Sequence, residues 1–474
     1  MRCSVLSLLL LTTACSAKSE DPGLDLVDGA LDAGDGGFDP DVGEGGLGAD
    51  VGDGGTTPTC TGLRCQQVKC DSGKSTTVSG KVYAPNGTLP LYNVIVYVPN
   101  GTPAPLPTGV SCDRCGAVAS GDPIVTALTD ATGSFVLKDV PVGKDIPLVV
   151  QLGKWRRQVT IPEVKACVDT PFTDASKTRL PKNRTEGDMP RIAVTTGVAD
   201  KIACMLPKIG IDKAEFGPGN GAKTFAVEFY DGAQIPGYTS SGPPGTPTAT
   251  VLWNDLAKLK QYDLVVISCE GYESSTEYPG TYGGWPKTQS KTSYQAMTDY
   301  LGAGGRMFTT DYEYTWYKYS PDAALKAAMT IPGGAPGGAN PMDIDTTFPK
   351  GKALADWLKV VEPASTAGKL QCDYVFDNVS ASTKVSQVWT RSGATPHPRF
   401  VTINAPVGKP AEAQCGKAVH LDAHINMSDK VDATFPAGCT SPLKEGEKAF
   451  AFFFFDLAAC IQEEGEPPKP PPIK

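Results

Sequence analysis

The chain shows two successive patterns of hydrophobic and polar positions. Between residues 77 and 162, apolar and polar residues alternate in short runs that Gly, Asn, Asp and Pro separate. Alternation with a period of two is typical of half-buried β-strands joined by tight turns. The expected strands cover residues 78–83, 91–98, 124–129, 134–137, 147–152 and 157–161, with 124–129 and 134–137 paired as a hairpin. We therefore predict a small all-β sandwich.

After residue 188, short apolar runs alternate with stretches of helical period. The expected strands are 191–197, 225–230, 262–267, 306–311 and 417–421, and the expected helices are 199–209, 249–259, 294–303 and 449–463. This alternation predicts a largely parallel sheet with helices on both faces. Residues 272–293 and 331–349, rich in Gly with Tyr or Pro, interrupt it. The predicted fold is multidomain: a small all-β sandwich followed by an α/β, flavodoxin-like domain with a mostly parallel sheet and long insertions.

The first sixteen residues have the pattern of a secretory signal. Arg2 precedes a short apolar run, and Leu11-Thr12-Thr13-Ala14-Cys15 follows it. This ending resembles the lipobox of bacterial lipoproteins, which implies that Cys15 carries the lipid. Ser16 rather than Asp follows Cys15, and in that family this implies a lipid-anchored protein of the outer membrane, facing either the periplasm or the cell surface. The alternative is a plain signal peptide in which Cys15 is incidental.

Changes of composition give the expected boundaries. We expect a signal peptide at 1–14, the acylated Cys15 with a Gly/Asp-rich disordered tether at 15–59, a Cys-rich connector at 60–76, the sandwich at 77–165, a linker at 166–188, the α/β domain at 189–464 and a Pro-rich tail at 465–474. The net charge of -9 argues against a nucleic-acid partner, which requires a basic surface.

Cysteine content predicts a disulfide framework. Of 14 cysteines, Cys3 leaves with the signal and Cys15 takes the lipid. The disulfide candidates are Cys60, Cys65, Cys70, Cys112, Cys115, Cys167, Cys204, Cys269, Cys372, Cys415, Cys439 and Cys460. An even number in an exported chain favours disulfides, whose connectivity the spacing leaves open. A zinc knuckle at the first three and a redox pair at Cys112 and Cys115 are the weaker alternatives.

Two stretches of sequence resemble known families. Gly80-Lys81-Val82, Pro85-Asn86-Gly87, and Thr129-Asp130-Ala131-Thr132-Gly133-Ser134-Phe135 resemble the carboxypeptidase regulatory-like, transthyretin-like β-sandwich. That resemblance implies a spacer or adhesion module. Tyr262-Asp263-Leu264-Val265-Val266, Gly304-Gly305-Arg306 and a late strand running towards His424 resemble the class I glutamine amidotransferase-like fold.

The second resemblance implies a Cys nucleophile on the turn after strand 306–311 and a His base after a late strand. The turn here reads Thr309-Thr310-Asp311-Tyr312-Glu313 and has no Cys, whereas His424 matches the His. Cys269 lies one strand earlier. We therefore expect no glutaminase chemistry, and we expect Cys269 to be bonded to another Cys or buried away from His424. The weak catalytic candidates are Cys269, His424, Asp311 and Glu313.

The leading functional hypothesis is a non-catalytic binding or scaffold lipoprotein of the cell envelope. The alternative is a hydrolase that uses a cleft of the α/β domain, and a free thiol at Cys269 would favour it. A carbohydrate or a protein is the expected ligand, because Tyr and Trp residues cluster at 312–319 with Tyr278, Tyr282 and Trp285. Packing of these side chains in the core of the insertions explains the cluster equally well. With three His and none spaced as a helical metal pair, we expect no metal and no cofactor.

Overall fold

The structure is a computed structural model that describes residues 60–219, 224–232, 242–270, 289–334, 337–429 and 435–473. The described residues belong to one compact unit, Thr59–Lys474. The predicted signal peptide, Cys15 and the tether lie outside the described residues. Within the described part of the chain, no helix has both the length and the apolar character needed to cross a membrane.

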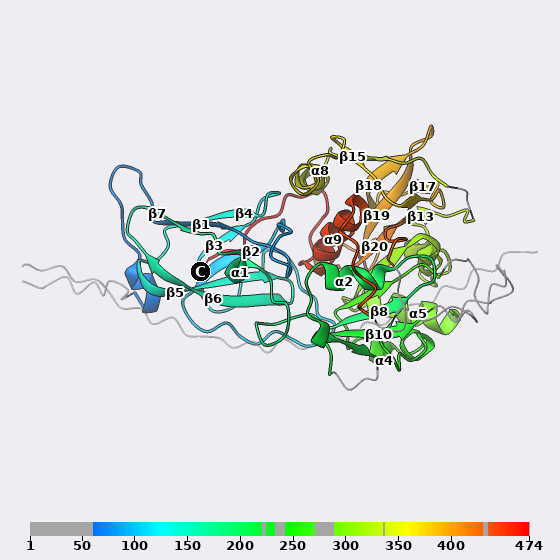
Figure 1. The fold of residues 1–474 in the computed structure, drawn as a ribbon, viewed down its shortest axis with the longest axis horizontal. Coiled ribbons are helices and arrows are strands. Elements are labelled where there is room, and N and C mark those ends of the chain that lie inside the picture. Colours follow the sequence, from blue (N-terminus) through cyan, green and yellow to red (C-terminus); the bar gives the residue numbers. More distant parts are fainter. Residues whose placement is uncertain are drawn as a thin grey trace, which may run out of the picture. The chain divides into compact units, whose positions relative to one another are not determined.

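The sandwich consists of two small sheets. The four-stranded sheet has the order β3 (Pro123–Leu128), β2 (Ile95–Pro99), β5 (Gly143–Leu152), β6 (Trp155–Val164), and the three-stranded sheet the order β4 (Ser134–Lys138), β1 (Thr77–Lys81), β7 (Asp169–Phe172). These strands are the blue to teal arrows of Figure 1. The predicted strands are confirmed. The segment 166–188, which we expected to be a linker, instead contains β7 and the short helix α1 (Ala175–Thr178).

The predicted hairpin between 124–129 and 134–137 is wrong. β3 pairs with β2 whereas β4 pairs with β1, so the turn at Asp130–Gly133 carries the chain from one sheet to the other. The Asp130 side chain accepts hydrogen bonds from the backbone N–H groups of Thr132 and Ser134 at 2.8 and 3.0 Å. A turn closed by an Asp side chain does not require hydrogen bonds between the two strands that flank it. The sequence therefore predicts that the chain reverses at this turn, but it does not predict with which strand β4 pairs.

The second sheet has ten strands, half of them outside the predicted parallel core. Its order is β15 (Lys369–Leu370), β14 (Met342–Ile344), β18 (Ser386–Ser392), β19 (His397–Ala405), β20 (Gly416–Leu421), β12 (Arg306–Thr310), β11 (Leu264–Ile267), β8 (Ile192–Thr196), β10 (Val227–Asp231), β9 (Phe216–Pro218). From β20 to β9 every neighbouring pair is parallel, and from β15 to β20 every pair is antiparallel. The sheet is therefore mixed rather than mostly parallel, because segments after residue 341 extend it.

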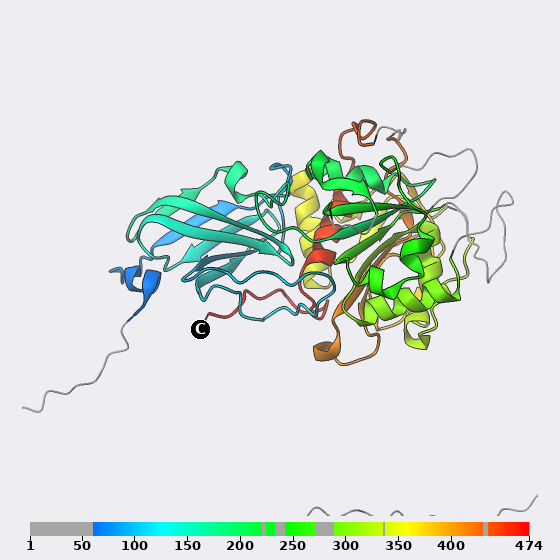
Figure 2. The same cartoon turned by 90° about the horizontal axis from the view of Figure 1, so that it is seen from below.

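Helices cover both faces of this sheet. The longer helices are α5 (Lys291–Gly302), α8 (Pro349–Val361) and α9 (Glu445–Ala458), and the short ones are α2 (Met205–Lys208), α3 (Thr250–Trp253), α4 (Leu256–Leu259), α6 (Thr315–Lys318) and α7 (Ala323–Lys326). Alternate residues of a strand point to opposite faces. Val194, Val266 and Phe308 pack with α8 and α9, whereas Ala193, Val265 and Met307 pack with α3, α4 and α5. Figure 2 shows α8 and α9 (yellow and red) on one side of the sheet and the green to yellow-green helices α3, α4 and α5 on the other.

The predicted helix 249–259 is broken into α3 and α4. Asp255 lies between them in an extended conformation, and its side chain accepts a hydrogen bond from the backbone N–H of Lys258. An Asp that caps the next turn competes with continuing the helix. Two small two-stranded sheets complete the fold: β13 (Met329–Thr330) with β17 (Ala381–Ser382), and β16 (Tyr374–Val375) with β21 (Ala423–His424).

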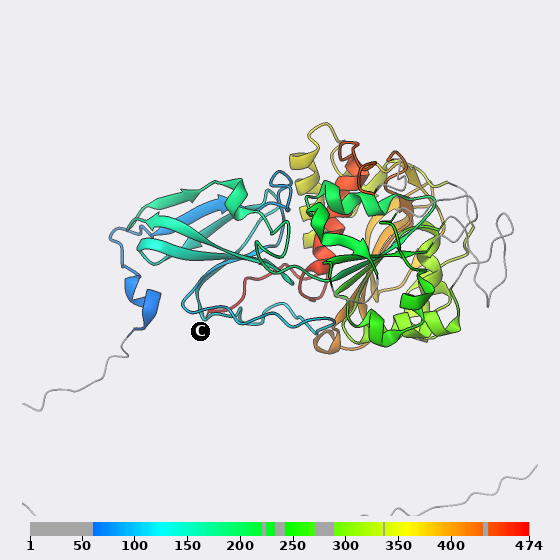
Figure 3. The same cartoon turned by 60° about the horizontal axis from the view of Figure 1, so that its bottom comes forward.

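Helix α9 belongs to the cores of both the sandwich and the large sheet. Phe452 stacks on Tyr92 of the sandwich with ring centroids 5.9 Å apart, and Phe450 contacts Phe308 of β12 at 4.7 Å. The apolar core is continuous from the sandwich through α9 to the sheet. A helix that is apolar on all sides is stable only when it is buried on all sides. In Figure 3, α9 is the red helix that runs beside the sheet.

Five disulfides are present among the described residues. They join Cys60–Cys65, Cys70–Cys167, Cys112–Cys415, Cys115–Cys460 and Cys204–Cys439. The prediction that most of the twelve are paired is confirmed, and Cys112 and Cys115 bind distant partners rather than each other. Cys269 and Cys372 are buried and belong to none of these disulfides, contrary to their inclusion among the disulfide candidates.

A buried ion cluster lies beside α9. Lys350 contacts Asp456 at 2.9 Å and Glu464 at 3.1 Å, and Lys417 forms ion pairs with the same two carboxylates. All four side chains are less than a tenth exposed. Two cations and two anions balance each other, which is the arrangement that buried charges require.

Candidate functional site

Polar side chains gather at the carboxyl edge of the parallel strands. Asp200 follows β8, Cys269 follows β11, Asp311 follows β12 and His424 follows β20. Their exposed fractions are 1%, 0%, 0% and 7% respectively. The carboxyl edge is where open α/β sheets place their ligands, and buried titratable groups are rare unless they are paired or functional.

Asp311 lies at the centre of this group. Its Oδ2 atom accepts hydrogen bonds from Cys269 Sγ at 3.1 Å and from His424 Nε2 at 3.0 Å. Its Oδ1 atom accepts one from Asn378 Nδ2 at 2.9 Å. One donor atom from each of Cys269, Asp311 and His424 lies within 4.8 Å of the others. We call these three residues the Cys–Asp–His centre.

The expectation that Cys269 is paired with another Cys or buried away from His424 is therefore wrong. β12 lies between β11 and β20 in the sheet, so the residue after β12 contacts the residues after both neighbours. The order of strands along the chain does not reveal this adjacency, because 112 residues of helices, insertions and antiparallel strands separate Asp311 from His424.

Asp311 also has an unusual backbone conformation, with a φ of +43°. A positive φ costs energy for residues other than Gly, although Asp tolerates it better than most. Strain of this kind at the end of a strand is the geometry that presents a nucleophile in α/β hydrolytic enzymes. Asp311 thus occupies the turn that the amidotransferase resemblance assigns to a nucleophile.

Burial and charge shift the protonation of the centre. Burial lowers the pKa of His424, but the hydrogen bond to Asp311 and the charge of Asp200 outweigh it, and the net pKa is raised. Burial, reinforced by the charge of Asp311, raises the pKa of the Cys269 thiol well above its ordinary value. Burial also raises the pKa of Asp200 to about 6 and that of Asp422 to about 7. At neutral pH the thiol is therefore protonated.

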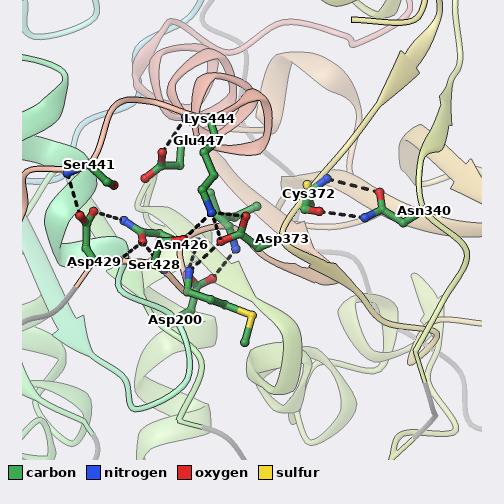
Figure 4. Close-up of polar contacts among 12 residues, drawn as sticks. Asp200, Asn340, Cys372, Asp373, Asn426, Ser428, Asp429, Ser441, Lys444 and Glu447 are labelled. Atoms are coloured by element: carbon green, nitrogen blue, oxygen red, sulfur yellow. Dashed lines mark hydrogen bonds and ion pairs between the residues drawn. The ribbon is translucent and has the colours of Figure 1, made fainter.

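The loop that carries His424 is fixed by carboxylates on both sides. Asp200 accepts the backbone N–H groups of Ile425 and Asn426 at 3.0 and 2.8 Å. Asp373 Oδ2 accepts the backbone N–H of Met427 at 3.0 Å, and the same carboxylate binds Lys444 Nζ at 2.8 Å, a contact drawn in Figure 4. The ring of His424 is thus held at the strand edge rather than on a free loop.

The other weak candidates have structural surroundings. Glu313 accepts hydrogen bonds from Trp316 Nε1 at 2.8 Å and Gln289 Nε2 at 2.9 Å, so it serves as a buried acceptor for its neighbours. His420 lies inside β20, and burial lowers its pKa to about 3. Trp316 packs edge-on against Trp253 in the core, as the packing interpretation of the aromatic cluster requires. Tyr278, Tyr282 and Trp285 lie outside the described residues.

Sequence reasoning missed three residues of the site. Asp200, Asn378 and Asp422 are buried, and Asn378 Nδ2 bridges Asp311 to Asp422 Oδ1 at 2.8 Å. Asp200 and Asp422 each follow a predicted strand, which is a usable signal. Asn378 comes from the segment between the predicted elements and carries no such signal.

The centre offers thiol, carboxylate and imidazole donors from three strand ends. These are the described residues whose donor atoms lie close enough to share a cation. Without a cation, a His hydrogen-bonded to a carboxylate is the arrangement of a general base and its orienting group. Cys269 is not an activated nucleophile, because an activated thiol needs a lowered pKa.

Comparisons with known proteins add little to this description. No family model matches the sequence, and no curated protein matches it. Among solved structures, ThuA-like proteins from Parabacteroides merdae and Bacteroides uniformis are 11% and 12% identical, with TM-scores of 0.31 and 0.27. The matched regions span 57% and 56% of this chain, and 91% of the length of each ThuA-like chain. A type II cohesin–X-dockerin complex from Acetivibrio cellulolyticus matches 25% of this chain and 67% of its own, at 18% identity and a TM-score of 0.15. At these TM-scores the comparisons carry no argument about fold or function.

Proposed function

We propose that this protein is a hydrolase of the cell envelope, anchored through Cys15, whose reaction takes place at the Cys–Asp–His centre. The observation that carries the proposal is the contact of a strained, fully buried Asp311 with both His424 and Cys269. A binding scaffold gains nothing from keeping three such groups together at the carboxyl edge of its sheet.

The reduced state of Cys269 favours the hydrolase over the scaffold. A disulfide at Cys269 would have prevented its thiol from taking part in a reaction at the carboxyl edge of the sheet. Cys269 is instead reduced, whereas ten other described cysteines form disulfides. Groups with shifted protonation that converge at a ligand-binding edge mark functional sites more often than structural ones.

Glutaminase-type acyl transfer is not the reaction we propose. That mechanism needs a thiolate on the turn after β12, where this chain has Asp311. The proposed reaction is the addition of water across an ester, amide, glycosidic or phosphoester bond. The hydroxyl group goes to the electrophilic centre, and the proton goes to the leaving group. Of the three residues of the Cys–Asp–His centre, His424 is the one with a measurable exposed fraction. We therefore expect the attacking water on the His424 side of the centre.

The proposed location rests on the first sixteen residues. The sandwich then serves as a spacer between the tether and the α/β domain, as its resemblance to carboxypeptidase regulatory-like domains implies. The disulfides Cys112–Cys415 and Cys115–Cys460 hold a sandwich loop against the α/β domain, which suits a module that carries its neighbour rigidly.

The test uses the full-length protein in detergent with chromogenic nitrophenyl esters, glycosides and phosphates and with peptide anilides. We expect turnover of one class, with losses in Asp311→Asn and His424→Gln and none in Cys372→Ser. Cys372 is the matched control because it is the other buried cysteine outside the disulfides. Turnover of none of the four classes, or equal turnover in all variants, would return the domain to the scaffold hypothesis.

A further inference from the structure

We propose that Cys269, Asp311 and His424 are the three protein ligands of a zinc ion whose fourth position is open to water. The inference rests on the proposed function in one respect: the zinc-bound water would be the hydrolytic nucleophile. The site itself stands on the donor geometry.

The distances fit a tetrahedral ion after a small expansion. Zn–S bonds of about 2.3 Å and Zn–N and Zn–O bonds of about 2.1 Å place tetrahedral S and O donors about 3.6 Å apart, and N and O donors about 3.4 Å apart. The observed separations are 3.1 Å from Sγ to Asp311 Oδ2 and 3.0 Å from His424 Nε2 to the same atom. The first separation must lengthen by about 0.5 Å and the second by about 0.4 Å, changes that small side-chain rotations produce.

The donor set selects the metal. One thiolate, one imidazole and one carboxylate suit zinc, whereas magnesium and calcium prefer oxygen donors alone. Three protein ligands with an open position are typical of catalytic zinc, and structural zinc has four. The three residues come from separate strand ends, so the helical spacing used to argue against zinc does not apply to them.

Neighbouring groups already hold the ligands in place. Asn378 donates to the outer oxygen of Asp311 at 2.9 Å, and Thr310 Oγ1 accepts the backbone N–H of Cys269 at 3.2 Å. Asp200 fixes the loop after His424. Groups that orient metal ligands in this way are a regular part of zinc sites.

The two cysteines outside the disulfides, Cys269 and Cys372, differ in a way that supports the assignment. Cys372 contacts the side-chain amide of Asn340 through its own backbone and packs against Gly446 under the first turn of α9. Cys269 instead directs its sulfur to a carboxylate that also binds an imidazole.

The experiment measures metal directly and needs no substrate. Full-length protein, purified without chelators and dialysed against zinc, is expected to hold one equivalent of zinc by elemental analysis. Cys269→Ser, Asp311→Asn and His424→Gln should each lose most of it, and Cys372→Ser should keep all of it. Cobalt substitution should give a thiolate-to-cobalt charge-transfer band that is present in Cys372→Ser and absent in Cys269→Ser.

Each outcome bears on the proposal. Far-ultraviolet circular dichroism of every variant separates lost metal from lost fold, and the cobalt band of the wild type stands even if a variant does not fold. A wild-type protein without zinc or the cobalt band, or equal zinc in Cys269→Ser, overturns the site. Zinc binding without hydrolysis would contradict only the proposed function. Hydrolysis that depends on His424 in a protein without bound zinc would contradict only the proposed zinc site.

Discussion

Replacing Lys417 by Met should strongly destabilise the protein. Lys417 is 3% exposed and forms ion pairs with Asp456 and Glu464, so the substitution leaves two buried carboxylates with Lys350 alone. Removing one partner of a buried ion pair costs about 3–5 kcal/mol, because the remaining charge stays buried without compensation. We expect that loss in the free energy of unfolding from urea titrations followed by tryptophan fluorescence.

The cost of Lys417→Met should depend on pH with a defined sign. Burial raises the pKa of Asp456, but Lys350 and Lys417 outweigh it and hold the pKa well below its ordinary value. A carboxylate with a lowered pKa stabilises the fold fully above its unfolded pKa of about 3.9, and this contribution disappears as the pH falls towards the folded pKa. The deficit of the mutant should therefore be constant from about pH 5 to 8 and shrink below about pH 4.

Two further variants make the reasoning refutable. Adding Glu464→Gln to Lys417→Met removes the surplus negative charge and should restore part of the lost free energy of unfolding. Such a recovery shows that the two sites are coupled, because the effects of independent substitutions add. Lys352→Met breaks an exposed ion pair with Asp356 and should cost no more than about 0.5 kcal/mol. A cost of Lys417→Met no larger than that of Lys352→Met, or one that stays unchanged down to pH 3, would contradict the ion-cluster explanation.

Three other predictions follow from the chain. Alkylation of the unfolded, unreduced protein should label Cys269 and Cys372 and none of the ten paired cysteines, which mass spectrometry of peptides will read out. Gly197→Ala places a Cβ 2.1 Å from the backbone oxygen of Cys269 and should lower the free energy of unfolding by about 1–3 kcal/mol. The Cβ of Gly302→Ala meets no atom within 4 Å, so this control should not destabilise the protein. Equal effects of the two substitutions would contradict the packing argument. Cys15→Ala should yield unprocessed or soluble protein, and unchanged partitioning into detergent would contradict the lipid anchor.

Much of the fold could be read from the sequence because local pattern determines it. The strands β8 and β11 are short runs rich in β-branched residues, and β12 combines Met307 and Phe308 with two Thr. The structure places each strand within a few residues of its expected bounds. The partners of β4 and the antiparallel extension by β14, β18 and β19 could not be predicted. Pairing between strands depends on tertiary contacts, and the period-two pattern is the same for either partner.

The site was only half predictable for the same reason. His424 and the turn of Asp311 were singled out through the amidotransferase resemblance, which implies a His after a late strand and a nucleophile after strand 306–311. Their contact depends on β20 lying next to β12. Cys269 was misjudged because an even number of cysteines suggested complete pairing. The number of cysteines carries no information on whether a particular thiol lies beside a carboxylate and an imidazole.

The distant partners of Cys112 and Cys115 have a consequence for the order in which the protein matures. Their bonds close across 303 and 345 residues, so neither can form until most of the chain has been synthesised. During that interval the two thiols lie three residues apart and are each other's nearest oxidation partner. A bond between them would block both native disulfides, and its removal requires attack by another thiolate. Yield of the native protein should therefore depend on a disulfide isomerase, and it should fall when an oxidant acts alone.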